Sequence, residues 1–171
     1  RKFVEEFYLQ TVQDNEMLQG VLEESSIMWS DDLDFILIMV LRTISSMREG
    51  QELEILPQYK SDDDAAFVKK LFAAAAVGYG ENLEILDQYT KNWDVERIAV
   101  MDNIIMTTAI AELITFDSIP VKVTLDEYIE ISKYYSTLGS STFINGILDK
   151  LSTDLVKSGK IVKQGRGLVE I

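Results

Sequence analysis

The chain has 171 residues, of which 47% are hydrophobic and 26% charged, so it can form one domain or two small bundles around a real core. It contains no histidine and no cysteine, which excludes Ser-His-Asp and Cys-His catalysis, disulfide bonds and zinc sites made of those side chains. The formal net charge is −13, and residues 1–64 hold fifteen acidic against five basic side chains, so that part is a poor surface for phosphate.

Hydropathy and the start of the chain bear on its location. The longest apolar run, Phe35 to Leu41, is too short for a membrane span, and no signal-peptide pattern opens the sequence. The absence of cysteine fits the reducing cytoplasm. We therefore expect a cytoplasmic protein without membrane contact, and a first residue of Arg1 rather than Met indicates a fragment of a longer chain.

Helical periodicity dominates the apolar pattern, and only two prolines, Pro57 and Pro120, interrupt it. The sequence predicts an all-α fold of about seven helices in two packed bundles, with residues 50–61 as the connector between them. The predicted helices cover residues 1–24, 30–49, 62–77, 79–91, 94–116, 124–137 and 140–157.

Three parts of the chain differ in charge and periodicity. Residues 1–61 form an acidic helical part, residues 62–157 a second helical bundle, and residues 158–171 a basic irregular tail with a small predicted hairpin. The two tryptophans, Trp29 and Trp93, lie 64 residues apart, and a few other identities share that offset. This repeat predicts that the first part is half of a duplicated bundle, with chance identity as the alternative.

Two of the C-terminal helices have predicted starts with a physical cause. Thr124 and Glu127 are spaced as a capping box, in which a hydroxyl and a carboxylate satisfy free backbone amides. Pro120 favours an extended entry into that helix. Ser140 is the predicted cap of the last helix.

Acidic residues at other helix starts are predicted to be structural. Asp94 is expected to cap the helix after Trp93, and Asp62-Asp63-Asp64 places negative charge at a positive helix end. A calcium loop beginning at Asp62 would need a turn glycine and a bidentate glutamate where Phe67 and Ala73 stand. No glycine segment has the pattern of a phosphate loop. We therefore predict no metal, no cofactor and no enzymatic activity.

Asn145 and Gly146 are poor residues for a helix interior, yet they lie within the last predicted helix. Gly146 is predicted to allow another helix to cross closely. Asn145 is predicted to be buried and to bond the backbone of the turn at 120–123, because a buried amide needs partners. Direct contact with a partner molecule is the alternative.

Basic side chains gather near the end of the chain, where Asp154 and Glu170 are the acidic residues beside them. A solvated basic tail is one interpretation, and a contact with RNA or an acidic partner is the other. The basic residues are Lys150, Lys157, Lys160, Lys163 and Arg166.

An ordered set of motifs over roughly residues 65–157 resembles the C-terminal bundle of the NusB family. The motifs are Asn-Trp-Asp-Val-Glu-Arg-Ile at 92–98, Ala-Ile-Ala-Glu-Leu at 109–113, Ile-Pro-Val-Lys-Val at 119–123, and Phe143 with the Ile-Asn-Gly-Ile-Leu-Asp-Lys that follows it. The resemblance implies two three-helix bundles and a non-enzymatic protein that helps RNA polymerase to read through terminators.

The resemblance also implies partners and contact residues. NusB proteins pair with NusE, a small-subunit ribosomal protein, and the pair binds boxA RNA of ribosomal RNA operons within the RNA polymerase antitermination complex. By the same resemblance Asp102 and Glu112 are the candidate contacts to NusE. The candidate contacts to RNA are Lys122, Lys150, Lys157 and Lys160.

The sequence departs from the family where the family binds RNA. An arginine-rich first helix is replaced by an acidic segment, and Asn103 and Thr107 stand where the family usually has arginine. Two alternatives therefore stay open: a helical protein-interaction module that has lost RNA binding, and a NusB-like domain of an RNA cytosine methyltransferase.

Overall fold

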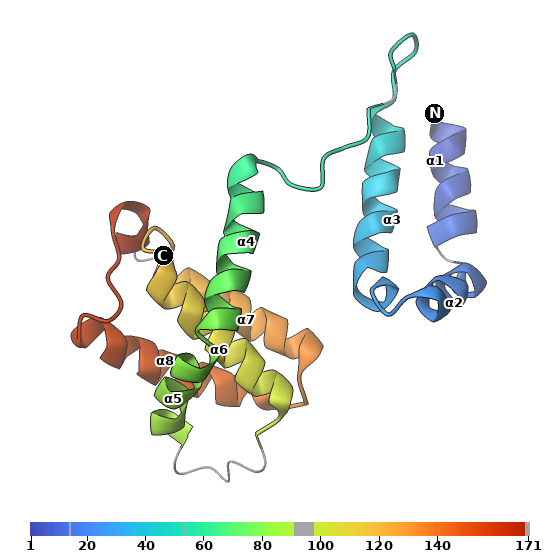
Figure 1. The fold of residues 1–171 in the computed structure, drawn as a ribbon. Coiled ribbons are helices and arrows are strands. Elements are labelled where there is room, and N and C mark those ends of the chain that lie inside the picture. The colour runs from blue at the N-terminus through green and yellow to red at the C-terminus, as the bar shows by residue number, and fades with distance from the viewer. Residues whose placement is uncertain (14, 53, 91–97, 170–171) are drawn as a thin grey trace. The chain divides into compact units, whose positions relative to one another are not determined.

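The computed structural model describes residues 1–13, 15–52, 54–90 and 98–169, and every regular element in these ranges is a helix (Figure 1). The predicted all-α class is confirmed. The chain divides into two compact units, residues 1–60 and 61–171. Trp93 and its predicted cap Asp94 lie outside the described residues. None of the described helices combines the length and apolar character that crossing a membrane requires.

Unit 1 begins with a helix that is interrupted, so the prediction of one continuous helix over residues 1–24 is wrong. Asn15 causes the break, because its side chain accepts a hydrogen bond from the Leu18 amide at 3.0 Å and starts a new helix there. The elements of this unit are α1 (Lys2–Tyr8), a π-helical turn (Leu9–Gln13), α2 (Glu16–Ser25) and α3 (Trp29–Ser46).

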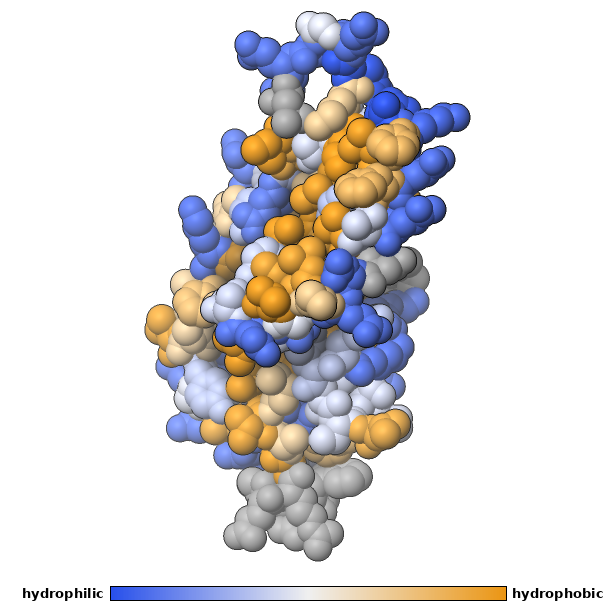
Figure 2. Space-filling view, turned by 90° about the vertical axis from the view of Figure 1, so that its right-hand side faces the viewer, coloured by the Kyte–Doolittle hydropathy of each residue, from blue (hydrophilic) through white to orange (hydrophobic). Residues whose placement is uncertain are grey.

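The core of unit 1 is small and joins α1 to α3. Tyr8, Leu33 and Leu37 are buried, and the Tyr8 hydroxyl donates to the Leu37 carbonyl at 3.1 Å. Burial raises the pKa of Tyr8. Many other apolar side chains of the described chain reach the surface, where Figure 2 shows them as patches among hydrophilic neighbours.

Unit 2 contains five α-helices within its described residues and a short 3-10 helix near the end. The predicted helices at 62–77 and 140–157 are confirmed to the residue, and Ser61 with Asp64 forms a capping box at the first of them. The predicted negative charge in that first turn is also confirmed. The elements are α4 (Asp62–Val77), α5 (Tyr79–Thr90), α6 (Val100–Thr115), α7 (Val121–Tyr135), α8 (Ser140–Lys157) and η3 (Gly165–Leu168).

α6 is the central helix of unit 2 and contacts α4, α5, α7 and α8 (Figure 1). Its sequence is apolar on nearly every side, which is typical of a helix surrounded by protein. Met106, Ile110 and Leu113 are fully buried on it, and Ile144 and Leu148 of α8 belong to the same core. Packing therefore fixes the positions of the buried polar groups on α6, which are Asp102, Thr107 and Glu112.

Two predicted caps in this unit are wrong. α7 begins at Val121, directly after Pro120, whose backbone (φ −59°, ψ 143°) confirms the predicted extended entry. Thr124 consequently lies inside the helix and is fully buried, so it forms no capping box with the exposed Glu127. Ser140 is the first residue of α8 rather than its cap, because Gly139 at φ +93° makes the turn before it.

The predicted hairpin in the tail is also wrong, since residues 165–168 form the 3-10 helix η3. The tail also bonds to the turn after α6, where the Gln164 amide donates to the Asp117 carbonyl at 2.9 Å. Because Leu168 belongs to η3, it cannot form the second strand predicted beside residues 161–162.

Asn145 and Gly146 are both exposed on α8, so their predicted burial against residues 120–123 and against a crossing helix is wrong. A Cβ added at Gly146 would meet nothing within 4 Å. Helical periodicity explains the outcome, because the buried residues Ile144, Ile147 and Leu148 define the opposite face.

Replacing Gly146 with alanine is expected to stabilise the protein by about 1 kcal/mol, because glycine loses more backbone entropy in a helix and the added methyl group meets no neighbour. Thermal unfolding followed by circular dichroism measures this. An alanine at Gly167, where space is lacking, is the matched control and should destabilise. A lower midpoint for Gly146→Ala would show that the surface around it is covered.

Candidate functional site

α6 carries two buried carboxylates, one near each end, and they organise the C-terminal part of unit 2. Asp102 in its first turn is 4% exposed and Glu112 toward its other end is 6% exposed. The family resemblance of the sequence implies that both contact NusE. In the structure, hydroxyl groups of the same chain donate hydrogen bonds to each of them. Because both carboxylates are buried, their exposure does not support direct contact with a partner, and that contact stays a prediction.

Asp102 ties the start of α6 to the turn between α7 and α8. Its carboxylate accepts hydrogen bonds from the hydroxyls of Ser136 and Ser140, the latter at 2.9 Å. Thr137 extends the cluster through a 2.7 Å hydrogen bond with Ser140. A negative charge in the first turn is also favoured by the helix dipole. This cluster fixes the α7–α8 turn against α6.

Glu112 ties the end of α6 to α7. Its two oxygens accept hydrogen bonds from the Thr124 hydroxyl at 2.8 Å and from the Tyr128 hydroxyl at 3.1 Å. Burial, and next the negative charge of Glu112, raise the pKa of Tyr128 strongly, so the phenol stays a neutral donor. Thr124, predicted as a cap, is therefore a buried hydrogen-bond donor to this carboxylate.

Tyr128 is expected to make the fold sensitive to alkaline pH. The pKa of its phenol lies above the unfolded value of about 10 in the folded state, so its contribution is complete below pH 10 and is lost above it. The wild-type free energy of unfolding should fall more steeply than that of Tyr128→Phe, by about 1.4 kcal/mol per pH unit above pH 10. Urea unfolding at pH 9 to 11 measures this, with Tyr134→Phe as the exposed control. Equal slopes for wild type and Tyr128→Phe would contradict the assignment.

The C-terminal tail closes on the end of α6 through Lys163. Its ammonium donates to the carbonyls of Leu113 at 3.0 Å and Phe116 at 2.7 Å, at the helix end where carbonyls lack intrahelical amide donors. Burial lowers the pKa of Lys163, and the carboxylates of Glu112 and Asp117 act against that shift. This lysine is therefore a structural clamp rather than part of a free basic tail.

Gly167 completes the clamp because the tail passes against the backbone of Asp117. A Cβ at residue 167 would lie 2.0 Å from the Asp117 carbonyl oxygen, a distance that no side chain tolerates. Gly165 adopts φ +52°, a left-handed conformation that glycine reaches without strain. The Gly-Arg-Gly stretch thus serves close packing.

The four predicted RNA contacts are all exposed, at three places in unit 2. Lys150 and Lys157 lie seven residues apart and share one face of α8. Lys160 follows the end of that helix, and Lys122 lies in the first turn of α7. These side chains are placed to reach an anionic partner, whereas Lys163 is held inside.

A cleft of about 510 Å³ lies between the start of α7, α8 and the tail. Lys122 and Lys163 border it, together with Asp149, while Leu125 and Val156 contribute apolar walls. Charges of both signs line it, so it has neither the uniform positive charge of a phosphate pocket nor acidic ligands gathered for a cation. Within the described ranges, no three carboxylates are grouped so that they could hold a metal ion.

Sequence patterns place the exposed lysines but give no sign of the buried hydroxyl partners of the two carboxylates. Ser136, Ser140 and Tyr128 come from segments far along the chain from α6, and no local spacing connects them.

Phe143 and Ile147 of α8 pack in the same core as Val121 and Leu125 at the start of α7.

Comparison with known proteins places this framework among sequences of one family. The NusB family model matches residues 36–153. A curated protein of Salinibacter ruber, "Transcription antitermination protein NusB", is 38% identical over 122 residues, which is 70% of this chain and 76% of that protein. The protein of the same name from Chloroherpeton thalassium is 46% identical over 80 residues, 47% of this chain and 38% of its own length.

A third relative of that name and a solved structure indicate the same family. The protein of Pseudothermotoga lettingae is 40% identical over 70 residues, 41% of this chain and 50% of that protein. The solved structure of T. maritima NusB superposes with a TM-score of 0.54 at 25% identity, covering 83% of this chain and 89% of that one. The similarity thus extends over both units of the chain.

Proposed function

The chain belongs to the NusB family, and from this premise we propose that it is a non-enzymatic transcription antitermination factor that binds NusE and, with NusE, boxA RNA of ribosomal RNA operons. The family match over residues 36–153 carries the proposal, since it includes α6, α7 and all of α8 except its last turn. In this role the protein joins the RNA polymerase antitermination complex as a scaffold and changes no covalent bond.

The proposed mechanism assigns different tasks to the buried and the exposed charges. Asp102 and Glu112 hold α7 and α8 against α6 from within, so the surface offered to NusE keeps one shape. A surface that is ordered before binding loses less conformational entropy when the partner docks. Lys150, Lys157 and Lys160 remain exposed for phosphate.

The need for a cationic partner follows from the charge of the chain. A net charge of −13 repels RNA, and a few exposed lysines on α8 offset only a small part of it. NusE would supply the additional positive charge in a composite RNA surface. Binding of boxA RNA is therefore expected to depend on NusE and to weaken as salt is raised.

Fluorescence anisotropy with labelled boxA RNA tests the proposal, with and without NusE and over a series of salt concentrations. We expect weak binding to the chain alone and tight, salt-dependent binding when NusE is present. A scrambled RNA of the same length serves as the control for sequence preference. If NusE binds the chain but the mixture does not retain boxA RNA better than NusE alone, the protein is a helical interaction module without the RNA function.

A further inference from the structure

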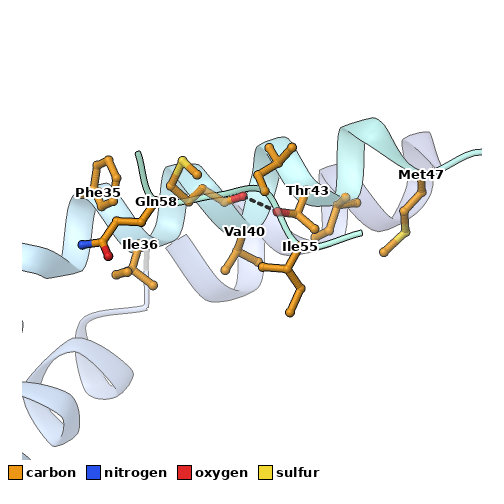
Figure 3. Close-up of a pocket in the computed structure, with 10 residues that line it drawn as sticks. Phe35, Ile36, Val40, Thr43, Met47, Ile55 and Gln58 are labelled. Carbon is orange, nitrogen blue, oxygen red and sulfur yellow. Dashed lines mark hydrogen bonds between the residues drawn. The ribbon is translucent and has the colours of Figure 1, made fainter. Parts of the chain in front are cut away.

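A groove of about 540 Å³ runs along α3 in unit 1 and is closed on one side by residues 55–58 (Figure 3). Phe35, Ile36 and Val40 line it from α3, Met47 lines it from the residue after that helix, and Ile55 lines it from the opposite segment. Thr43 turns its hydroxyl back to the Met39 carbonyl at 2.8 Å, as the dashed line in Figure 3 marks. The one hydroxyl in the lining is therefore satisfied within the helix, and apart from the Gln58 amide the surface offered is apolar.

The groove lining is open to water in the chain as described. Phe35 is 45% exposed, Val40 39% and Ile55 81%, although α3 buries Leu33 and Leu37 on its other side. A contiguous apolar surface of this kind is typical of a protein-binding site. The α3 residues that line it, from Phe35 to Ile44, span about 14 Å at about 1.5 Å per residue, which matches two to three turns of a second helix.

One end of the groove opens into an acidic hollow, and this identifies the charge of the occupant. The hollow of about 300 Å³ shares Met47 and Leu56 with the groove and is lined by Glu52 and Glu54. Its cation, Arg48, donates to the carbonyls at the end of α3, at 3.1 to 3.2 Å. Among the described residues no ion pair reaches Glu52 or Glu54.

The net charge of unit 1 is negative, like that of the hollow. Residues 1–60 carry twelve acidic and five basic side chains, so the surface around the groove attracts cationic segments and repels acidic ones. An acidic partner or a nucleic acid would meet unfavourable charge at both the hollow and its surroundings.

We infer that the α3 groove docks a cationic amphipathic helix of a partner protein. Apolar side chains of that helix, recurring every third and fourth residue, fill the space between α3 and residues 55–58. A lysine or arginine beyond the last apolar position reaches Glu52 and Glu54. The surface belongs to unit 1 and uses none of the α6–α8 residues, so it extends the proposed function to a second contact.

Methionine methyl groups report on the groove directly. The full chain labelled with carbon-13 at its methionine methyls is titrated with a synthetic peptide of about four helical turns, with leucines on one face and lysines at one end. The methyl signals of Met39 and Met47 should shift with saturation. Met17, Met28, Met101 and Met106 are outside the groove and should shift little.

Two matched comparisons separate the inference from unspecific binding. Val40→Lys should weaken peptide binding by about tenfold or more, because it places a positive charge, like those of the peptide, among the apolar anchors. Val21→Lys makes the same change at an exposed position of α2, and this variant should bind the peptide as tightly as wild type. Glu52→Gln with Glu54→Gln should weaken binding and reduce its salt dependence. Circular dichroism confirms that each variant is folded.

Several outcomes would overturn the inference. A peptide with glutamates in place of the lysines that binds equally well would remove the charge argument. Shifts of Met39 and Met47 that depend on protein concentration without peptide would show that a second copy occupies the groove. Equal effects of Val40→Lys and Val21→Lys, or no shift at Met39 and Met47, would show that the helix does not bind there. None of these readouts involves NusE or RNA, so they do not depend on the proposed function.

Discussion

Replacing Glu112 with alanine is expected to lower the free energy of unfolding by about 2 to 4 kcal/mol, because it leaves the buried hydroxyls of Thr124 and Tyr128 without their acceptor. Each buried donor that loses its partner costs about 1 to 3 kcal/mol. The substitution also removes the contact that holds α7 to the end of α6. Urea unfolding followed by circular dichroism measures the loss.

Two further variants define what that result means. Glu112→Gln keeps an acceptor oxygen and should cost less than Glu112→Ala, while Glu127→Ala changes an exposed glutamate and should stay within about 0.5 kcal/mol of wild type. NusE affinity of folded Glu112→Gln should stay close to wild type. A large loss of NusE affinity without loss of stability would assign Glu112 to the partner contact instead.

Replacing Lys150, Lys157 and Lys160 together with glutamine is expected to weaken boxA RNA binding in the presence of NusE by about 10- to 100-fold. All three side chains are exposed, and two of them share a face of α8. The slope of log affinity against log salt should fall by about 0.7 for each phosphate of single-stranded RNA that a lysine no longer neutralises. Fluorescence anisotropy over a salt series measures both quantities.

A control with the same change of charge separates local contact from general electrostatics. Lys2, Lys60 and Lys69 are exposed and lie on other elements of the chain. Their triple glutamine variant should retain most of the RNA affinity. If both triple variants lose affinity equally, the lysines of α8 act only through net charge and do not touch RNA.

The sequence predicts helices well where local chemistry decides and poorly where distant contacts decide. The bounds of α4 and α8 are predicted to the residue, and both helices start at local signals: Ser61 caps α4, and the turn at Gly139 precedes α8. α7 begins three residues earlier than predicted, since Thr124 bonds Glu112 instead of capping the helix. Asn15 is a cap signal within the sequence itself, and it is strong enough to divide the helix predicted over 1–24.

The candidate site shows the same division. Exposure of Lys150 and Lys157 follows from helical periodicity, and the same periodicity places Asn145 and Gly146 outside the core. The burial of Asp102 depends on Ser136 and Ser140, which only the folded α7–α8 turn brings to it. The role of Lys163 likewise requires the tail to return to α6.

Isothermal titration calorimetry of NusE into the full chain, without RNA, tests the central claim most directly. The account predicts a saturable one-to-one association that survives Gly146→Ala and weakens at high salt, because a basic protein docks on a surface that is already ordered. A titration with no binding heat, confirmed by the absence of a joint peak in gel filtration, would contradict it.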